Sequence, residues 1–145
     1  MLKDVIWPIV RERKVLEKLG IAIFQKFSLK KRFCIQMMRF GIVDWLLSIL
    51  VDIKPSHQQY ELQYGLALLM NLTLHKLGQR LFSTAKIDVL QILCSHFGVI
   101  SELELETCIN GSIYCLMSVP HLKEKARQMG LREMLEKRLL SCDNE

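Results

Sequence analysis

Gly65-Leu-Ala-Leu-Leu-Met-Asn-Leu-Thr-Leu74 is the stretch that decides the fold, because its pattern recurs on both sides. Gly20-Ile-Ala-Ile-Phe-Gln-Lys-Phe-Ser-Leu29 precedes it by 65 − 20 = 45 residues, and Ser112-Ile-Tyr-Cys-Leu-Met-Ser-Val-Pro120 follows it by 112 − 65 = 47 residues. A period of this length is typical of stacked helical repeats. In such a stack a unit buries its apolar face only against its neighbours, so the product of the fold is a surface.

A second pattern keeps the same period. Gly41-Ile-Val-Asp-Trp-Leu46, Ala85-Lys-Ile-Asp-Val-Leu90 and Gly130-Leu-Arg-Glu-Met-Leu135 begin 44 and 45 residues apart, and each predicts the start of a second helix. A short connecting segment precedes each of them, at residues 28–40, 76–84 and 121–129. Three helices per unit, with the first one short, is the armadillo arrangement, whereas HEAT units have two.

The sequence therefore predicts an all-α fold: an armadillo-type right-handed α-solenoid with two full three-helix repeats and partial flanking repeats. We expect a single domain over residues 1–145, with a partial repeat at about 1–27, repeats at 28–75 and 76–120, and a partial repeat at 121–140. The first partial repeat contributes one long helix from about Val10 to Phe27. Both ends look cut, and their uncovered apolar faces predict self-association or marginal stability.

Composition supports a packed intracellular domain without catalytic machinery. Half of the 145 residues are apolar, and only three prolines and seven glycines interrupt them. The five cysteines have no CxxC spacing, and we expect no signal peptide and no membrane span. The four histidines have no partner at metal spacing, and no phosphate loop or nucleophile elbow occurs. We therefore expect no enzyme activity, no metal and no cofactor, and we interpret Cys108 and Cys115 as core residues rather than a redox or metal pair.

The net charge of +5 raises the question of a nucleic-acid partner. No helix-turn-helix or RNA-binding signature accompanies the basic residues, which favours a solvated basic face or an acidic protein partner. The basic residues concerned are Arg11, Arg13, Lys14, Lys18, Lys30, Lys31 and Arg32.

Several motifs together resemble one family. They are Gln25-Lys-Phe-Ser-Leu-Lys-Lys31, Gly41-Ile-Val-Asp-Trp-Leu46, Tyr64-Gly-Leu-Ala-Leu-Leu-Met-Asn-Leu-Thr-Leu74, the Ile109–Pro120 segment with its Asn-Gly-x-x-Tyr-x-x-x-Ser-Val-Pro pattern, and Lys123-Glu-Lys-Ala-Arg-Gln-Met-Gly130. The combination resembles the armadillo region of the LisH-domain armadillo-repeat protein of cilia and basal bodies, over roughly residues 20–138. From these residues alone we expect a departure from that family, the lack of the amino-terminal LisH dimerisation motif and of the coiled coil after it.

The resemblance implies a non-enzymatic protein-interaction scaffold of the cilium or basal body, which contributes to cilium assembly and to ciliary, Hedgehog-type signalling. It implies a cytoplasmic protein at the cytoskeleton, at the basal body or centriole, with ciliary or centrosomal protein partners that include microtubule-associated ones. Neither a small-molecule substrate nor a nucleic acid is expected. The alternative is a general armadillo adaptor that binds an acidic peptide or helix outside cilia.

One side of the long helices is mostly polar and is the candidate partner groove. Residues four apart share a side of a helix, because four residues advance about 400°. In armadillo proteins the long third helix lines the concave face, so stacking would set these positions side by side. This stripe is either a binding groove or simply the solvated side of each helix. The candidate residues are Lys14, Lys18, Lys26, Gln59, Gln63, Asn71, Asn110, Tyr114 and Ser118.

Overall fold

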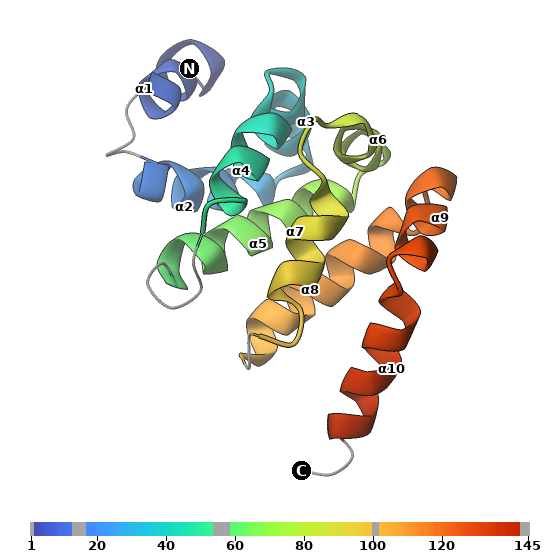
Figure 1. Ribbon diagram of the computed structural model, residues 1–145. Coiled ribbons are helices and arrows are strands. Elements are labelled where there is room, and N and C mark those ends of the chain that lie inside the picture. Colours follow the sequence, from blue (N-terminus) through green and yellow to red (C-terminus); the bar gives the residue numbers. More distant parts are fainter. Residues whose placement is uncertain (1, 13–16, 54–58, 100–101, 143–145) are drawn as a thin grey trace.

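Helices make up every regular element of the structure. The computed structural model describes residues 2–12, 17–53, 59–99 and 102–142, and no strand occurs in these ranges (Figure 1). The elements are a π-helical segment η1 (Leu2–Ile6), α1 (Trp7–Glu12), α2 (Glu17–Ser28), α3 (Lys31–Arg39), α4 (Ile42–Leu50), α5 (Gln59–Thr73), α6 (Lys76–Thr84), α7 (Val89–His96), α8 (Leu103–Leu116), α9 (Pro120–Gln128) and α10 (Leu131–Cys142). The prediction of an all-α fold is confirmed.

The helices follow the predicted order of short, middle and long. α3, α4 and α5 form one set and α6, α7 and α8 the next, while α9 and α10 are the short and middle helices of a further unit. The long helices lie side by side, α2 against α5 and α5 against α8. This arrangement is the armadillo-type solenoid predicted from the period. The exact unit boundaries, and the treatment of the chain as one domain, stay predictions.

The amino-terminal region differs from the single long helix predicted from Val10 to Phe27. The structure has two helices there, α1 and α2, and residues 13–16 between them lie outside the described part of the chain. α1 lies against α2 and α4, with the Trp7 ring 5.8 Å from Phe24 and 5.7 Å from Trp45, centroid to centroid. Folding back buries Trp7 against these rings, which a continuous helix would not do.

Small residues set how closely the long helices approach the helices that cover them. A Cβ atom on Gly65 would lie only 2.8 Å from Leu50 Cδ2, so a larger residue at this crossing of α4 and α5 would force the Leu50 side chain to move. A Cβ atom on Gly20 would collide in the same way with Val10 of α1. The counterpart in α8 is Ser112, which is fully buried and donates its hydroxyl to the Cys108 carbonyl oxygen at 2.6 Å. The glycines that open the first two copies of the repeated pattern therefore mark helix crossings.

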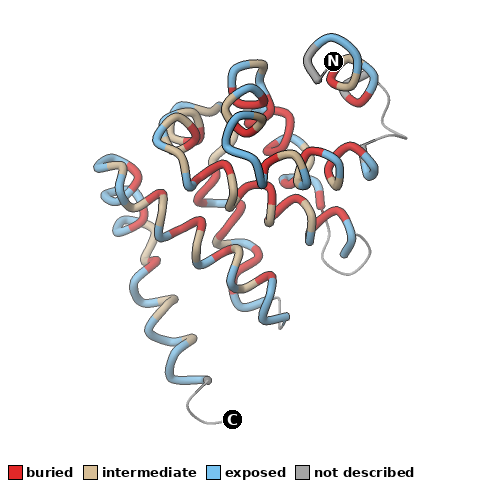
Figure 2. The backbone as a smooth tube through the Cα atoms, turned by 180° about the vertical axis from the view of Figure 1, so that it is seen from behind, coloured by how far each residue is buried: buried red, intermediate tan, exposed pale blue. Residues whose placement is uncertain are grey.

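These crossings join the buried side chains into one continuous apolar core. Figure 2 shows the buried positions running along the stacked helices, whereas the carboxyl-terminal helix α10 is mostly exposed or intermediate. The contrast is clearest for one pair of equivalent residues. Leu50 and Leu139 both follow the opening glycine of their helices by nine positions, since 50 − 41 = 9 and 139 − 130 = 9. Leu50 is 1% exposed and Leu139 is 67% exposed.

The three middle helices begin differently although their sequences are similar. Gly41 and Gly130 precede α4 and α10 with φ of 93° and 71°, which is backbone that side-chain-bearing residues rarely adopt. Ala85 stands at the equivalent position before α7 and has φ −65° and ψ 150°. α7 therefore begins later than the predicted start at Ala85, at Val89, where Asp88 accepts a hydrogen bond from the Leu90 N–H at 3.0 Å.

An ion pair ties α2 to α5. Lys18 Nζ lies 2.8 Å from Glu61 Oε1, and the Glu61 side chain is only 7% exposed. Burial alone would raise the pKa of the Glu61 carboxyl, but the hydrogen bond and the positive charge of Lys18 outweigh it and hold that pKa below its ordinary value of 4.5. The pair therefore links stacking of the first two long helices to the ionisation of one carboxylate.

Because Leu50 is buried at the crossing of α4 and α5 and the equivalent Leu139 is exposed, alanine substitutions of these two leucines should lower the free energy of unfolding by different amounts. Leu50→Ala should lower the free energy of unfolding by about 2–5 kcal/mol, because it leaves a cavity beneath Gly65. Leu139→Ala is the matched control and should change it by less than about 0.5 kcal/mol, since this leucine is exposed. Urea unfolding followed by circular dichroism measures both values. Equal effects would contradict the assignment of α5 as the cover of α4.

We expect the Glu61 carboxylate to account for part of the stability that the fold loses in acid. A carboxyl whose pKa is lowered in the folded state stabilises the fold above its unfolded-state pKa, and this contribution is lost as the pH falls through the folded-state pKa. Glu61→Gln should therefore unfold with a weaker dependence on pH below about 4.5 than the unmodified chain. Glu136→Gln removes the acid of an exposed pair with Arg132 and is the control, expected to leave the pH dependence nearly unchanged. Urea midpoints across the acid range test this, and identical slopes for Glu61→Gln and the unmodified chain would refute it.

Candidate interaction surface on the long helices

The polar stripe predicted from the sequence lies on α2, α5 and α8, with Ser118 just after the end of α8. We call the described members of this stripe the long-helix face: Lys18, Lys26, Gln59, Gln63, Asn71, Asn110, Tyr114 and Ser118. All are exposed except Asn71, which is partly buried. Lys14, the remaining predicted member, lies outside the described residues.

Side-chain contacts between neighbouring long helices share one spacing. Lys18 pairs with Glu61, where 61 − 18 = 43, and the Asn71 amide donates to Ser28 Oγ and the Gln59 amide to Glu102 at separations of 43 residues. For α2 and α5 this is two residues short of their sequence period of 45, and two residues rotate about 200° around a helix, so these two contacts join facing sides of the helices. For α5 and α8 it is four residues short of their period of 47. Residues that are a full period of 45 apart, such as Lys26 and Asn71, instead occupy equivalent positions on α2 and α5.

A hollow of about 240 Å³ lies where the three long helices meet. It brings together Lys26 and Gln63 of the predicted stripe and adds residues that the sequence analysis did not select. Glu104 at the amino-terminal end of α8 is one of them. The complete lining is Gln25, Lys26, Gln63, Tyr64, Ala67, Glu104, Leu105 and Cys108.

Asn71 has structural partners on both its side chain and its backbone. Its amide nitrogen donates to Ser28 Oγ at 2.8 Å, and its carbonyl oxygen accepts from the Cys34 thiol at 3.8 Å. These bonds tie α5 to α2 and α3. One donor position of the side chain is therefore already engaged in holding the stack together.

The α8 part of the long-helix face is the most open. Tyr114 is 83% exposed, and Asn110 is also exposed. Ser118 Oγ lies 2.9 Å from Gln79 Oε1 and 2.7 Å from the Cys115 carbonyl oxygen, so its single proton serves one of two acceptors. A large exposed aromatic ring with one polar tip is well suited to contact a protein partner.

Charge changes sign across the surface. The exposed Lys18 and Lys26 lie on α2, whereas the exposed Glu102 and Glu104 lie at the amino-terminal end of α8. α5 lies between them and contributes the amide of Gln63 to the hollow. Lysines on α2 are thus followed by an amide on α5, and the α8 side adds carboxylates that the predicted residues did not include.

Three of the thiols, those of Cys34, Cys94 and Cys108, are poor nucleophiles. Burial raises the pKa of Cys34 to about 11. Burial also raises the pKa of Cys94 and of Cys108, with the nearby Asp88 and Glu104 charges adding to the two shifts. Cys108 and Cys115 are both free thiols. No group of three His, Cys, Asp or Glu side chains within the described ranges could hold a metal ion.

No single helix in the part of the chain that the structure describes is long and apolar enough to cross a membrane. α3 and α4 reach that length and composition only as a pair, and the pair is bent by 83°.

Comparison with known proteins identifies relatives over most of the chain. The family model for the armadillo repeats of LisH domain-containing protein ARMC9 matches residues 37–145. The Xenopus laevis protein of that name is 33% identical over 130 residues, which is 89% of this chain and 16% of the relative. The human and zebrafish (Danio rerio) proteins are each 34% identical over 115 residues, 79% of this chain and 14% of the relative. No solved structure matches significantly.

The chain thus spans about one-sixth of the length of these relatives, within their repeat region. The 45-residue period, the order of the helices and these matches all indicate armadillo repeats. The chain belongs to the family of LisH domain-containing protein ARMC9, as a segment of its armadillo repeats.

Proposed function

We propose that this chain is a non-enzymatic protein-interaction scaffold of the cilium and basal body, which contributes to cilium assembly and to ciliary, Hedgehog-type signalling. The observation that carries the proposal is its membership of the ARMC9 family over most of its length. The ciliary role follows from the resemblance described above. The proposed location is the cytoplasm, at the cytoskeleton of the basal body or centriole.

The long-helix face is the proposed partner surface. It runs over three stacked helices, contains a polar hollow and has the exposed Tyr114 ring on α8. Armadillo repeats are extended solenoids whose surfaces bind other proteins. A ciliary or centrosomal partner, including a microtubule-associated one, would cross the three helices with acidic groups over Lys18 and Lys26 and basic groups near Glu102 and Glu104.

A second candidate function is a general armadillo adaptor that binds an acidic peptide or helix outside cilia. One observation favours it. Lys30, Lys31 and Arg32 are all exposed where α2 gives way to α3 and continue the basic side begun by Lys26. An acidic partner confined to this end would need neither α8 nor its tyrosine.

Proximity labelling in ciliated cells separates the two functions. The scaffold proposal predicts that basal-body and ciliary-tip proteins are labelled by the chain, within the longest natural protein that contains it. Labels confined to nuclear or junctional proteins would contradict the ciliary assignment and favour the adaptor.

Substitutions on the long-helix face predict which surface binds the labelled partner. Lys26→Ala combined with Tyr114→Ala should weaken binding to the purified partner by about tenfold or more, because exposed aromatic and basic side chains are frequent binding hot spots. Lys86→Ala combined with Gln91→Ala alters exposed positions away from this face and is the control. Both double variants should keep their unfolding midpoints. Equal affinities for the two double variants would remove the long-helix face as the binding surface.

Salt should weaken the same interaction. Exposed charges are screened over about 10 Å at 0.1 M ionic strength, so raising the salt should lower the association rate more than it raises the dissociation rate. Surface plasmon resonance at several salt concentrations measures both rates. A rate of association that does not change with salt would contradict recognition through Lys18, Lys26, Glu102 and Glu104.

A further inference from the structure

Two leucines protrude from the same place in two consecutive repeats. Leu29 lies in the turn between α2 and α3, Leu74 lies in the turn between α5 and α6, and the two are one period apart, since 74 − 29 = 45. They are 61% and 62% exposed. Single exposed leucines are common on protein surfaces, but these two recur with the repeat. Ser118 stands at the equivalent place before α9, so the feature spans two repeats.

The two turns are neighbours along one side of the stack. α2 packs on α5 and α3 packs on α6, and Figure 1 shows α3 and α6 side by side. At the ends of the long helices, the Asn71 amide donates to Ser28 Oγ at 2.8 Å. The Gln79 amide of α6 donates to the Thr73 carbonyl oxygen of α5 at 3.0 Å. Both turns are thus fixed by hydrogen bonds, on a side of the solenoid that further repeats would lengthen rather than cover.

Basic residues surround both leucines. Three of them follow Leu29 directly and one follows Leu74 two positions later, and all four are exposed. No Asp or Glu occurs in residues 18–43 or 62–87, although the chain has 15 acidic residues. The charge at both turns is therefore positive. We call these six residues the turn edge: Leu29, Lys30, Lys31, Arg32, Leu74 and Lys76.

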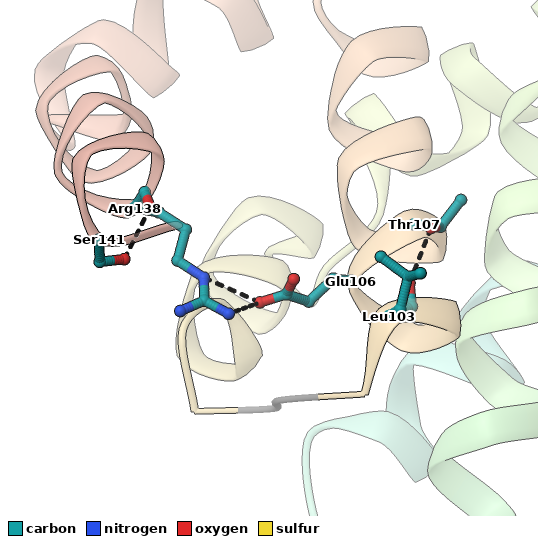
Figure 3. A network of polar contacts seen from close by, with 5 residues as sticks. All are labelled: Leu103, Glu106, Thr107, Arg138 and Ser141. Atoms are coloured by element: carbon teal, nitrogen blue, oxygen red, sulfur yellow. Dashed lines mark hydrogen bonds and ion pairs between the residues drawn. The ribbon is translucent and has the colours of Figure 1, made fainter. Parts of the chain in front are cut away.

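The positive charge of the turn edge is not neutralised within the fold. Elsewhere, several basic residues have acidic partners. Arg138 of α10 donates to Glu106 of α8, with Arg138 Nε 2.9 Å from Glu106 Oε1 (Figure 3), and Lys125 pairs with Asp88 at 2.7 Å. None of the four basic residues of the turn edge forms an ion pair within the part of the chain that the structure describes. Their charges remain available to an anionic partner.

The shape of the turn edge favours a flat partner. None of its six residues lines the polar hollow of the long-helix face, and its two leucines stand in exposed turns. Peptides are usually bound in grooves or along sheet edges. Nucleic acids are bound through phosphate contacts and through stacking on aromatic rings, neither of which uses a leucine. An anionic membrane surface, in contrast, attracts basic residues and buries apolar side chains at the same time.

We propose that the turn edge binds the surface of an anionic lipid membrane, with Leu29 and Leu74 inserted at the headgroup boundary and the four basic residues against the lipid phosphates. The contact is peripheral, and it leaves the long-helix face to a protein partner because the two surfaces share no residue. The proposal goes beyond the scaffold function and does not rest on it.

Co-sedimentation of the 145-residue chain with lipid vesicles tests the proposal. The chain should bind phosphatidylcholine vesicles that contain phosphatidylserine at least about tenfold more tightly than pure phosphatidylcholine vesicles, because each basic side chain near an anionic surface strengthens binding by about fivefold. Leu29→Glu combined with Leu74→Glu should weaken binding to the anionic vesicles by at least about tenfold, since a glutamate is repelled by this surface and does not insert into it.

Leu19→Glu combined with Leu103→Glu is the matched control, with the same change in net charge. Both leucines are exposed, and they lie at the amino-terminal ends of α2 and α8, away from the turns. Leu19 is about 15 Å from Leu29 along the helix axis, which exceeds the screening length of about 10 Å at 0.1 M salt, so binding should change by less than about threefold. Thermal unfolding checks that both double variants remain folded.

A tryptophan in place of one leucine separates insertion from attraction by charge. The emission of the Leu29→Trp chain should shift to shorter wavelength on anionic vesicles and should be quenched by brominated lipid. Leu103→Trp is the control and should show neither effect. Trp7 and Trp45 are buried, so they contribute little to the change.

Several results would overturn the proposal. They are the absence of binding to the anionic vesicles, an equal loss of binding in the two double variants, and binding without a change in the Leu29→Trp emission. Tighter binding to polyglutamate or to duplex DNA than to the vesicles, weakened by Leu29→Glu with Leu74→Glu, would assign the turn edge to an acidic protein or to a nucleic acid instead.

Discussion

The structure depends on the burial of each long helix between its neighbours at a close crossing. Gly65 lets α5 approach Leu50 of α4, and Gly20 lets α2 approach Val10 of α1. The leucines around such a crossing lose nearly all contact with water, which is worth about 1.5–3 kcal/mol for each large apolar side chain. No single unit can obtain this burial alone, so each repeat is stable only as part of the stack.

Much of the fold could be predicted because the crossings recur in the sequence. Each copy has a glycine or serine followed by leucines, and prolines or glycines separate the helices. These features define the period and the order of short, middle and long helices. The departures have local causes. α7 begins late because Ala85 does not adopt the conformation of Gly41 and Gly130, and α1 is a separate helix whose Trp7 packs against the rings of Phe24 and Trp45. Such rings reveal their partners only in three dimensions.

The sequence indicates which side of each long helix is polar, but not which of the polar groups already have partners within the fold. Counting by four along a helix identifies which residues share a side, and Lys26 and Gln63 indeed line one hollow. The count does not give the relative shift of adjacent helices. That shift engages the Asn71 amide with Ser28, 43 residues earlier, and the packing of α8 on α5 brings Glu104 to the hollow. A one-dimensional pattern therefore finds the face, and the packing of the helices decides which of its groups are already in use.

The placement of the indole rings gives the molecule a built-in local reporter. The chain has only two tryptophans, Trp7 and Trp45, and their ring centroids lie 5.7 Å apart in one cluster with Phe24 at the amino-terminal end. Their emission therefore reports on the helices around α1 and α4 and is blind to α8, α9 and α10. Backbone ellipticity, in contrast, sums over every helix. Loss of ellipticity before the tryptophan emission changes would show the solenoid melting from its carboxyl-terminal end, without the introduction of a label.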